Sequence, residues 1–381
     1  MTFNIKKTKF INSSIVPTKK YLRILFNKKN SFLTKRLILF NRGRESLRFA
    51  LNNISGIKYK KILVPPSICD SVLEVINNEG ININYYLLEK NLHVDIDNLK
   101  SKIDNNVGAI YINYFFGFIY NIDNIRKLCK ENNILLILDC AHVFSNYKLL
   151  NKLKPDFIIS SPRKFLPIPN GGILFINNLD LLKSKKLTVI YFKDEIKDLL
   201  KFFLRKIKYS NKIVGILYLN FKKLYKKNKS QELNFSLEKS KNERKYQGIS
   251  SLSENYIRKF NFENINNQRI RNLNYYFQLS KKFKNIKPIF KRLEYEYSPY
   301  CFPIYSKNRM EVVKKASEYG LILEPTLEEV KYKFDKSIIN DKKFECLSLF
   351  MSSILSLPTH QDLSEKDLYN IIYIVSTINK I

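Results

Sequence analysis

The amino-acid sequence predicts an α/β protein with a mostly parallel central sheet flanked by helices, plus a smaller C-terminal α+β domain. Strand-like apolar runs alternate with helix-like segments between residues 41 and 178, a pattern typical of parallel strands joined by covering helices. Residues 226–245 are polar and mark a linker or loop, after which shorter elements follow. We therefore expect a basic arm (1–40), a large α/β domain (41–240) and a small domain (241–381).

The elements of the large domain follow from periodicity and from residues that end strands and helices. Leu47 and Leu51 lie about one helical turn apart and favour a helix over residues 43–54. Two prolines stop the apolar strand at 61–66. The helix at 71–80 ends at Gly80, a residue suited to the position after a helix. The other expected elements are strands at 81–89, 107–117, 134–142, 156–161 and 171–178, and a helix at 121–133.

The small domain shows the same kinds of signal. Its final helix is predicted by Ser364 and Asp367, which form a capping-box pattern after the turn LPTHQD. The preceding expected elements are a helix at 263–279, a strand at 298–306, a helix at 310–320 and a strand at 321–325.

The segment 180–240 is apolar, basic and helical in pattern. We expect it to be a cover on the core or on a second subunit. An amphipathic helix on a membrane surface is the less favoured alternative.

The composition limits the classes of function. Lys and Arg number 67 against 34 Asp and Glu, a net charge of +33, but the excess is spread along the whole chain and predicts no specific nucleic-acid site. The five cysteines form no CxxC motif and the three histidines no HExxH-like pair, so no metal site is expected. No signal peptide or transmembrane run is found, and free thiols fit a reducing cytoplasm.

One pair of residues carries the chemistry. Asp139 closes the strand ILLILD, and Lys164 follows the next strand in SSPRKFLPIPNGG. Because ligands bind beyond the carboxyl ends of parallel strands, both side chains can face one crevice. A pyridoxal phosphate cofactor requires this pair: the lysine forms an imine, and the carboxylate keeps the ring nitrogen protonated. Taken singly, Asp139 is also a common helix cap and Lys164 a common solvated residue.

Six segments in order resemble the DegT/StrS family of pyridoxal-phosphate aminotransferases, which have the type I fold. They cover roughly half of the chain: GRESLRFAL, ILVPPSICDSVLEVINNEG, AIYINYFFG, ILDCAHVF, SPRKFLPIPNGGIL and ILSLPTHQDLSEKDLYNI.

The resemblance implies specific roles. Lys164 is the cofactor lysine and the base that moves the substrate proton, Asp139 pairs with the ring nitrogen, and His142 lies beside the ring. The remaining implied cofactor-binding residues are Ser161 (with Ser160 as a competing choice), Gly43, Arg44 and Glu45 around the phosphate, and Asn113 on a strand end.

Two departures from the family pattern stand out. The family's N-x-R-[ML]-S segment, whose Asn reaches the partner subunit's cofactor phosphate, is replaced here by YQGISSLS. The residue that stacks on the ring would be near Ile68 or Cys69, and neither is aromatic. A related dehydratase branch has His in place of the lysine, and Lys164 argues against that branch.

The resemblance also implies a substrate, a partner and a location. We expect amino transfer from glutamate to a nucleotide-linked keto-sugar for surface polysaccharide, by a cytoplasmic homodimer. Two alternatives stay open: a catalytically silent regulator or scaffold of the same fold, and a basic protein of membrane surfaces or nucleic acid.

Overall fold

The computed structural model describes residues 11–12, 36–53, 60–144, 153–177, 246–295, 297–323 and 350–379. Its centre is a seven-stranded sheet in which the strands from β4 to β8 run parallel. At the other edge, β9 and β2 pair antiparallel to their neighbours. In spatial order the strands are β2 (Leu37–Phe40), β9 (Gly172–Ile176), β8 (Phe157–Ser160), β6 (Leu135–Cys140), β5 (Val107–Asn113), β3 (Lys61–Val64) and β4 (Asn82–Tyr85).

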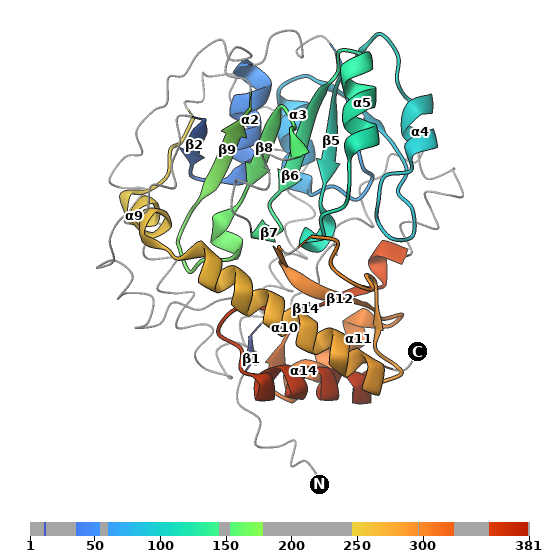
Figure 1. The fold of residues 1–381 in the computed structure, drawn as a ribbon, viewed down its shortest axis with the longest axis vertical. Coiled ribbons are helices and arrows are strands. Elements are labelled where there is room, and N and C mark those ends of the chain that lie inside the picture. The colour runs from blue at the N-terminus through green and yellow to red at the C-terminus, as the bar shows by residue number, and fades with distance from the viewer. Residues whose placement is uncertain are drawn as a thin grey trace, which may run out of the picture.

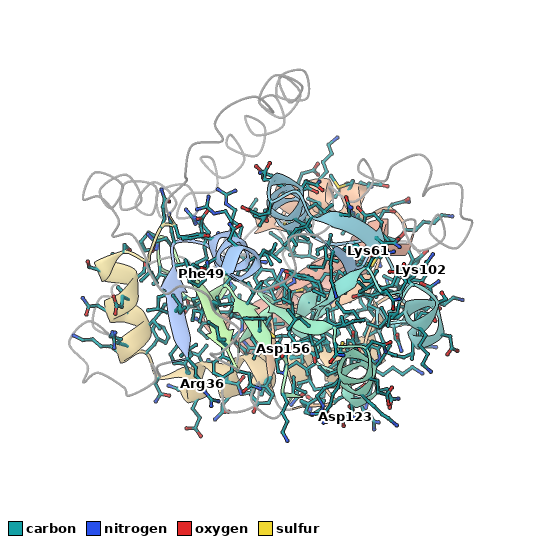
Figure 2. The ribbon with its side chains drawn as sticks, turned by 90° about the horizontal axis from the view of Figure 1, so that it is seen from above. Arg36, Phe49, Lys61, Lys102, Asp123 and Asp156 are labelled. Atoms are coloured by element: carbon teal, nitrogen blue, oxygen red, sulfur yellow. The ribbon has the colours of Figure 1, made fainter. Side chains whose placement is uncertain are left out.

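Helices cover both faces of this sheet (Figure 1). The helices α2 (Gly43–Asn53) and α3 (Asp70–Asn78) lie on one face, and α5 (Asp123–Glu131) lies on the other. Figure 2 shows the same layers from above, with Phe49 of α2 and Asp123 of α5 on opposite sides of the strands. The short helix α4 (Ile96–Ser101) follows β4.

The core is divided by the sheet because successive strand residues point to opposite faces. On β5, Ala109 and Tyr111 pack with α2 and α3, whereas Ile110 and Ile112 join the larger cluster on the other face. This larger cluster continues into the C-terminal part, so the two parts share apolar packing.

The C-terminal part is built around a three-stranded antiparallel sheet of β10 (Lys287–Pro288), β12 (Cys301–Tyr305) and β14 (Ile354–Pro358). It lies below the large sheet in Figure 1. The short strands β7 (Val143–Phe144) and β11 (Ser298–Pro299) pair antiparallel and join the two parts. Its helices are α9 (Ser251–Lys259), α10 (Phe262–Lys282), α11 (Arg309–Glu318) and α14 (Glu365–Ile378).

The structure confirms the predicted fold class, including the mostly parallel sheet between helical layers. It also confirms the capping box, because the Ser364 side chain accepts from the Asp367 amide and the Asp367 side chain accepts in return. The helical prediction for residues 180–240 lies wholly outside the described residues. None of the described helices combines the length and apolar composition that crossing a bilayer requires.

Two strands come from the region predicted to be an arm. β2 completes one edge of the large sheet, and β1 (Ile11–Asn12) pairs in parallel with β13 (Leu321–Ile322) of the C-terminal part. The run LILF in β2 is short and follows a basic stretch, so its period gave no signal of a sheet strand. Predicted strand lengths were also too generous at 81–89 and 134–142, where the ladders stop at Tyr85 and Cys140.

Candidate active site

Register places three of the predicted polar residues on one face of the sheet. Asn113 and Asp139 are direct partners at the ends of β5 and β6, and Asp139 is also paired with Ile159 of β8. Since side chains alternate along a strand, Asn113 and Asp139 face the same side as Tyr111, which is the α2 side. Ser161 follows β8 with the same alternation, beside the first turn of α2.

Asp139 is buried and held by three donors. The Tyr111 hydroxyl donates to Oδ2 at 2.8 Å, the Asn113 amide donates to Oδ2 at 3.1 Å, and the Ala141 backbone N–H donates to Oδ1 at 2.8 Å. Burial raises the pKa of the Asp139 carboxyl, while Lys164, the Ala141 N–H and the Tyr111 hydroxyl each act to lower it. The donors favour the ionised form and fix the direction in which the carboxylate points.

Lys164 ends the single 3-10 turn η4 (Pro162–Lys164) that follows β8. Its backbone N–H donates to the Ser161 carbonyl at 3.0 Å, and its side chain is half-buried. Burial lowers the pKa of the Lys164 amine, and Arg163 lowers it further, whereas Asp139 raises it. The structure therefore brings Lys164 and Asp139 into one electrostatic centre from neighbouring strand ends, as expected from the sequence.

His142 belongs to the same centre. Its ring is stacked on Tyr300, with centroids 4.9 Å apart and planes at 10°, and more distantly on Phe116 at 6.5 Å. Burial, followed by the nearby Lys164 cation, lowers the pKa of the His142 imidazole well below 6.5. The imidazole is therefore neutral at physiological pH and is able to accept a hydrogen bond.

The start of α2 lies against the end of β8. A Cβ atom built on Gly43 would be 3.6 Å from the Ser160 carbonyl oxygen and 3.9 Å from the Ser161 Cβ. The Ser160 hydroxyl donates to the Cys140 carbonyl at 3.5 Å, which favours Ser161 as the residue available to a ligand. The Glu45 amide donates to the Arg42 carbonyl at 3.0 Å and so is engaged in the helix turn.

Gly172, the last residue of the segment PNGG, allows this segment to approach the start of α2 closely. A Cβ on Gly172 would be only 2.2 Å from the Arg42 carbonyl carbon, so a side chain here would push the start of α2 away. The Gly171 N–H donates to the Asn41 carbonyl at 2.7 Å. The chain thus ties the helix start to the loop that carries Lys164.

Sequence reasoning missed two residues of the site. Tyr111 is hidden inside a buried strand, although its period places it on the Asp139 face. Tyr300 comes from the C-terminal part, where its backbone N–H donates to the Phe116 carbonyl at 2.8 Å, and its ring lies 5.9 Å from the Lys164 Nζ. Local sequence carried no signal for this contact, because it depends on the pairing of two two-residue strands, β7 and β11.

The structure shows where the two residues expected near the cofactor-stacking position lie. Ile68 is buried in the core and Cys69 is exposed at the start of α3, close enough to Lys164 to influence the pKa of its amine.

The segment YQGISSLS packs on the edge of the sheet, where the Asn41 amide donates to the Gln247 side chain at 2.9 Å. Within the described part of the chain, no group of three His, Cys, Asp or Glu side chains is placed to hold a metal ion.

Comparison with known proteins agrees with this fold. The family model described as aminotransferase class I and II matches residues 18–152. Helicobacter pylori PseC, an aminotransferase involved in pseudoaminic acid biosynthesis, shares 14% identity at a TM-score of 0.67 over 98% of this chain and 99% of its own. The sugar aminotransferase CalS13 from Micromonospora echinospora shares 11% identity at 0.62, over 97% and 100%.

The fold is that of the fold-type-I pyridoxal-phosphate aminotransferases. Among curated proteins, the chain is similar to cysteine desulfurases, for example SufS of Plasmodium falciparum (isolate 3D7; 30% identity, 34% of this chain) and IscS of Buchnera aphidicola (30%, 37%). The chain spans only 26% and 38% of the length of these two relatives.

The residues of this candidate site fit pyridoxal phosphate. A carboxylate offers about four acceptor positions, and the three donors to Asp139 leave room for one more, as a protonated ring nitrogen requires. The Arg44 amide and the Ser161 hydroxyl flank the start of α2, a helix end that favours phosphate. Neighbours of the same fold were solved with pyridoxal phosphate and with its amino form, in agreement with the expected cofactor.

Proposed function

We propose that this protein is a pyridoxal-phosphate-dependent aminotransferase of the DegT/StrS kind. The observation that carries the proposal is the meeting of Lys164 and Asp139, from consecutive strand ends, in a centre that also contains the neutral His142. Pairs of titratable groups whose surroundings shift their pKa values are typical of catalytic sites. The comparisons support the class of reaction, because the family model and the structural neighbours are aminotransferases.

Each residue has a defined task in the proposed reaction. The cofactor, when bound, supplies an aldehyde that combines with amines and a ring that accepts electrons. Asp139 would hold the ring nitrogen through its carboxylate, and Ser161 and the Arg44 amide, which follows Gly43, would hold the phosphate. Lys164 would hold the cofactor through Nζ, and the same atom would move the substrate proton. Its lowered pKa increases the fraction of free amine at neutral pH.

The neighbouring groups orient these residues. Asn113 and Tyr111 fix the Asp139 carboxylate, and His142 offers a neutral imidazole nitrogen beside the ring. Glu45 contributes a side chain that pairs with Arg48 at 3.1 Å and so stabilises the first turns of α2.

The proposed substrate is a keto-sugar linked to a nucleoside diphosphate, with glutamate as amino donor and surface polysaccharide as the destination. This follows the resemblance of the six sequence segments, and the sugar aminotransferases among the structural neighbours support it. The net charge of +33 favours an anionic substrate. We further propose a cytoplasmic homodimer with the sites at the interface.

The deciding experiment is an absorbance spectrum of the purified protein with pyridoxal phosphate. The band of lysine-bound cofactor should appear in the parent protein and in Lys315→Ala, an exposed lysine far from the site, and be absent in Lys164→Ala. Adding glutamate should convert the band to that of the amino form. If no donor in a panel of amino acids changes the spectrum, the catalytically silent alternative is preferred.

A second candidate function is removal of sulfur from cysteine. The similarity of about a third of the chain to cysteine desulfurases favours it. Both functions use the lysine and the cofactor, so the products must separate them. A desulfurase supplied with an added thiol reductant would release alanine and sulfide from L-cysteine without a ketone acceptor, because the thiol provides the two electrons that reduce the sulfur. The proposed aminotransferase would instead convert glutamate to its keto acid and transfer the amine to a ketone.

A further inference from the structure

An arginine from the C-terminal part lies immediately behind the lysine loop. Arg269 of α10 is only 1% exposed. Its guanidinium donates to the Tyr300 carbonyl at 2.8 Å and to the Gln361 Oε1 at 3.1 Å. Longer contacts reach the Pro299 carbonyl at 3.3 Å and the Thr359 hydroxyl at 3.4 Å. Because the guanidinium group is planar and carries several N–H donors, it can bind these oxygens together and hold them in a fixed geometry.

The same arginine and its partner hold the residue next to Lys164. The Arg269 Cζ atom lies 4.9 Å from the centre of the Phe165 ring, a cation–π distance. The Gln361 side-chain amide donates to the Phe165 carbonyl at 3.1 Å. Both ends of Phe165, its ring and its backbone, are thus attached to residues far away in the sequence.

Tyr300 forms a second connection to the lysine. The Phe165 ring packs edge-on against Tyr300 at 5.9 Å and 84°, and the Lys164 Nζ lies 5.9 Å from the Tyr300 ring on which His142 is stacked. Arg269 therefore binds the carbonyl of Tyr300 and the ring of Phe165, and both of these residues lie beside Lys164. Among the described residues, the titratable and charged groups that interact electrostatically with Lys164 are Asp139, His142, Arg163, Cys69 and Cys301.

We propose that Arg269 and Gln361 are positioning residues for Lys164. Through Phe165 and Tyr300 they fix the half-buried place of the Lys164 amine relative to Asp139 and His142. They are buried parts of the C-terminal unit and act through these two neighbours. The inference concerns the lysine of the proposed function, but it is a statement about the protein alone and is testable without cofactor.

The experiment measures how readily Lys164 is acetylated by acetic anhydride in the cofactor-free protein, as a function of pH, with mass spectrometry reporting each lysine. In the parent protein, burial lowers the pKa of Lys164, so its acetylation midpoint should lie below that of exposed lysines such as Lys315. In Arg269→Met and in Gln361→Met the amine is free to move towards solvent. Its midpoint should rise towards the value of the exposed lysines.

Arg309→Met is the matched control. Arg309 is also a buried arginine of the C-terminal part, and it donates to the Met351 and Ile354 carbonyls, away from the lysine loop. Its replacement should leave the Lys164 midpoint unchanged. Should Arg269→Met fail to fold, Gln361→Met, which removes a single side-chain amide, decides the question.

Two results would overturn the proposal. One is an unchanged Lys164 midpoint in a folded Gln361→Met or Arg269→Met protein. The other is an equal rise in Arg309→Met, which would show a general loosening of the C-terminal part. A failure of the proposed transamination would leave this measurement intact, because no cofactor or donor takes part in it.

Discussion

The amide of Asn113 and the carboxylate of Asp139 are hydrogen-bonded across adjacent parallel strands, with 3.1 Å between Nδ2 and Oδ2. The Tyr111 hydroxyl, two residues earlier on the same strand, reaches the same oxygen at 2.8 Å. Strand β5 therefore presents two neutral donors to an acid buried at the end of β6. Such donors stabilise the ionised acid without adding a competing charge.

Replacing Tyr111 with Phe should destabilise the protein by about 1.5–3 kcal/mol at neutral pH, the range for a hydrogen bond to a charged group. Burial already holds the pKa of Asp139 above its usual value, and loss of the Tyr111 hydroxyl raises it further. A raised carboxyl pKa makes stability fall as pH rises through that pKa. The stability lost in Tyr111→Phe should therefore be smaller at a pH below 3.8, where the Asp139 carboxyl is protonated in both the folded and the unfolded chain.

The control is Tyr86→Phe. The buried Tyr86 hydroxyl donates to the neutral Tyr111 carbonyl at 2.8 Å, so its loss should cost about 0.5–1.5 kcal/mol with little dependence on pH. Urea unfolding at several pH values measures both variants. A Tyr111→Phe penalty that is the same at acid and neutral pH would contradict an ionised Asp139.

Residues at strand ends could be predicted from the sequence, whereas residues that reach the site through distant contacts could not. Asp139 is visible in the sequence because it closes an apolar run, whereas Asn113 was expected from the family resemblance. Parallel pairing aligns the two residues. Ser161 follows from the same rule. Tyr300 could not be predicted, since it reaches His142 only through the short β7–β11 pair.

The sheet edge shows the same limit. Four apolar residues in β2 lie after a basic stretch, so local pattern assigned them to an arm, and only pairing with β9 makes them part of the sheet.

Gly117 should tolerate no side chain. It has a φ of +91°, and a Cβ atom would lie 1.9 Å from the His142 carbonyl oxygen and 2.8 Å from the Pro299 Cα. Gly117→Ala should therefore cost at least about 3 kcal/mol, since strain and a clash with two backbones add together. Thermal unfolding measures the loss, and the shift of the His142 carbonyl should also disturb the site.

Gly80→Ala separates the clash from the strain. Gly80 has a φ of +69°, but a Cβ atom added to it would have no other atom within 4 Å. Its replacement should cost about 1 kcal/mol, from backbone strain alone. Equal losses in the two variants would mean that the tight approach of Gly117 to His142 is absent in solution.

The capping box of α14 should contribute measurable stability. The Ser364 hydroxyl accepts from the Asp367 amide at 3.2 Å, and the Asp367 carboxylate accepts from the Ser364 backbone at 3.0 Å. Ser364→Ala should lower the free energy of unfolding by about 1 kcal/mol. Ser317→Ala is the control, because this exposed hydroxyl in α11 donates only to the Lys314 carbonyl at 2.6 Å and its loss should change stability by less than about 0.5 kcal/mol.

His142 should stay neutral where an ordinary histidine is charged. Burial and then the Lys164 cation lower its pKa well below 6.5, so its ring resonances in an NMR titration of the cofactor-free protein should not change between about pH 8 and 6.5. Lys164→Met removes the cation but leaves the burial, and the His142 pKa should rise while remaining below 6.5. Lys315→Met, at an exposed ion pair with Glu311, should have no effect.

The lowered pKa of His142 also determines how the stability of the protein depends on pH. A histidine whose pKa is lowered on folding takes up its proton more readily in the unfolded chain, so its penalty begins as pH falls through 6.5. The parent protein should lose stability over that window, and Lys164→Met should lose less. A His142 ring that titrates near 6.5 in the parent protein would place it away from Lys164, and the proposed neutral partner beside the cofactor ring would be lost with it.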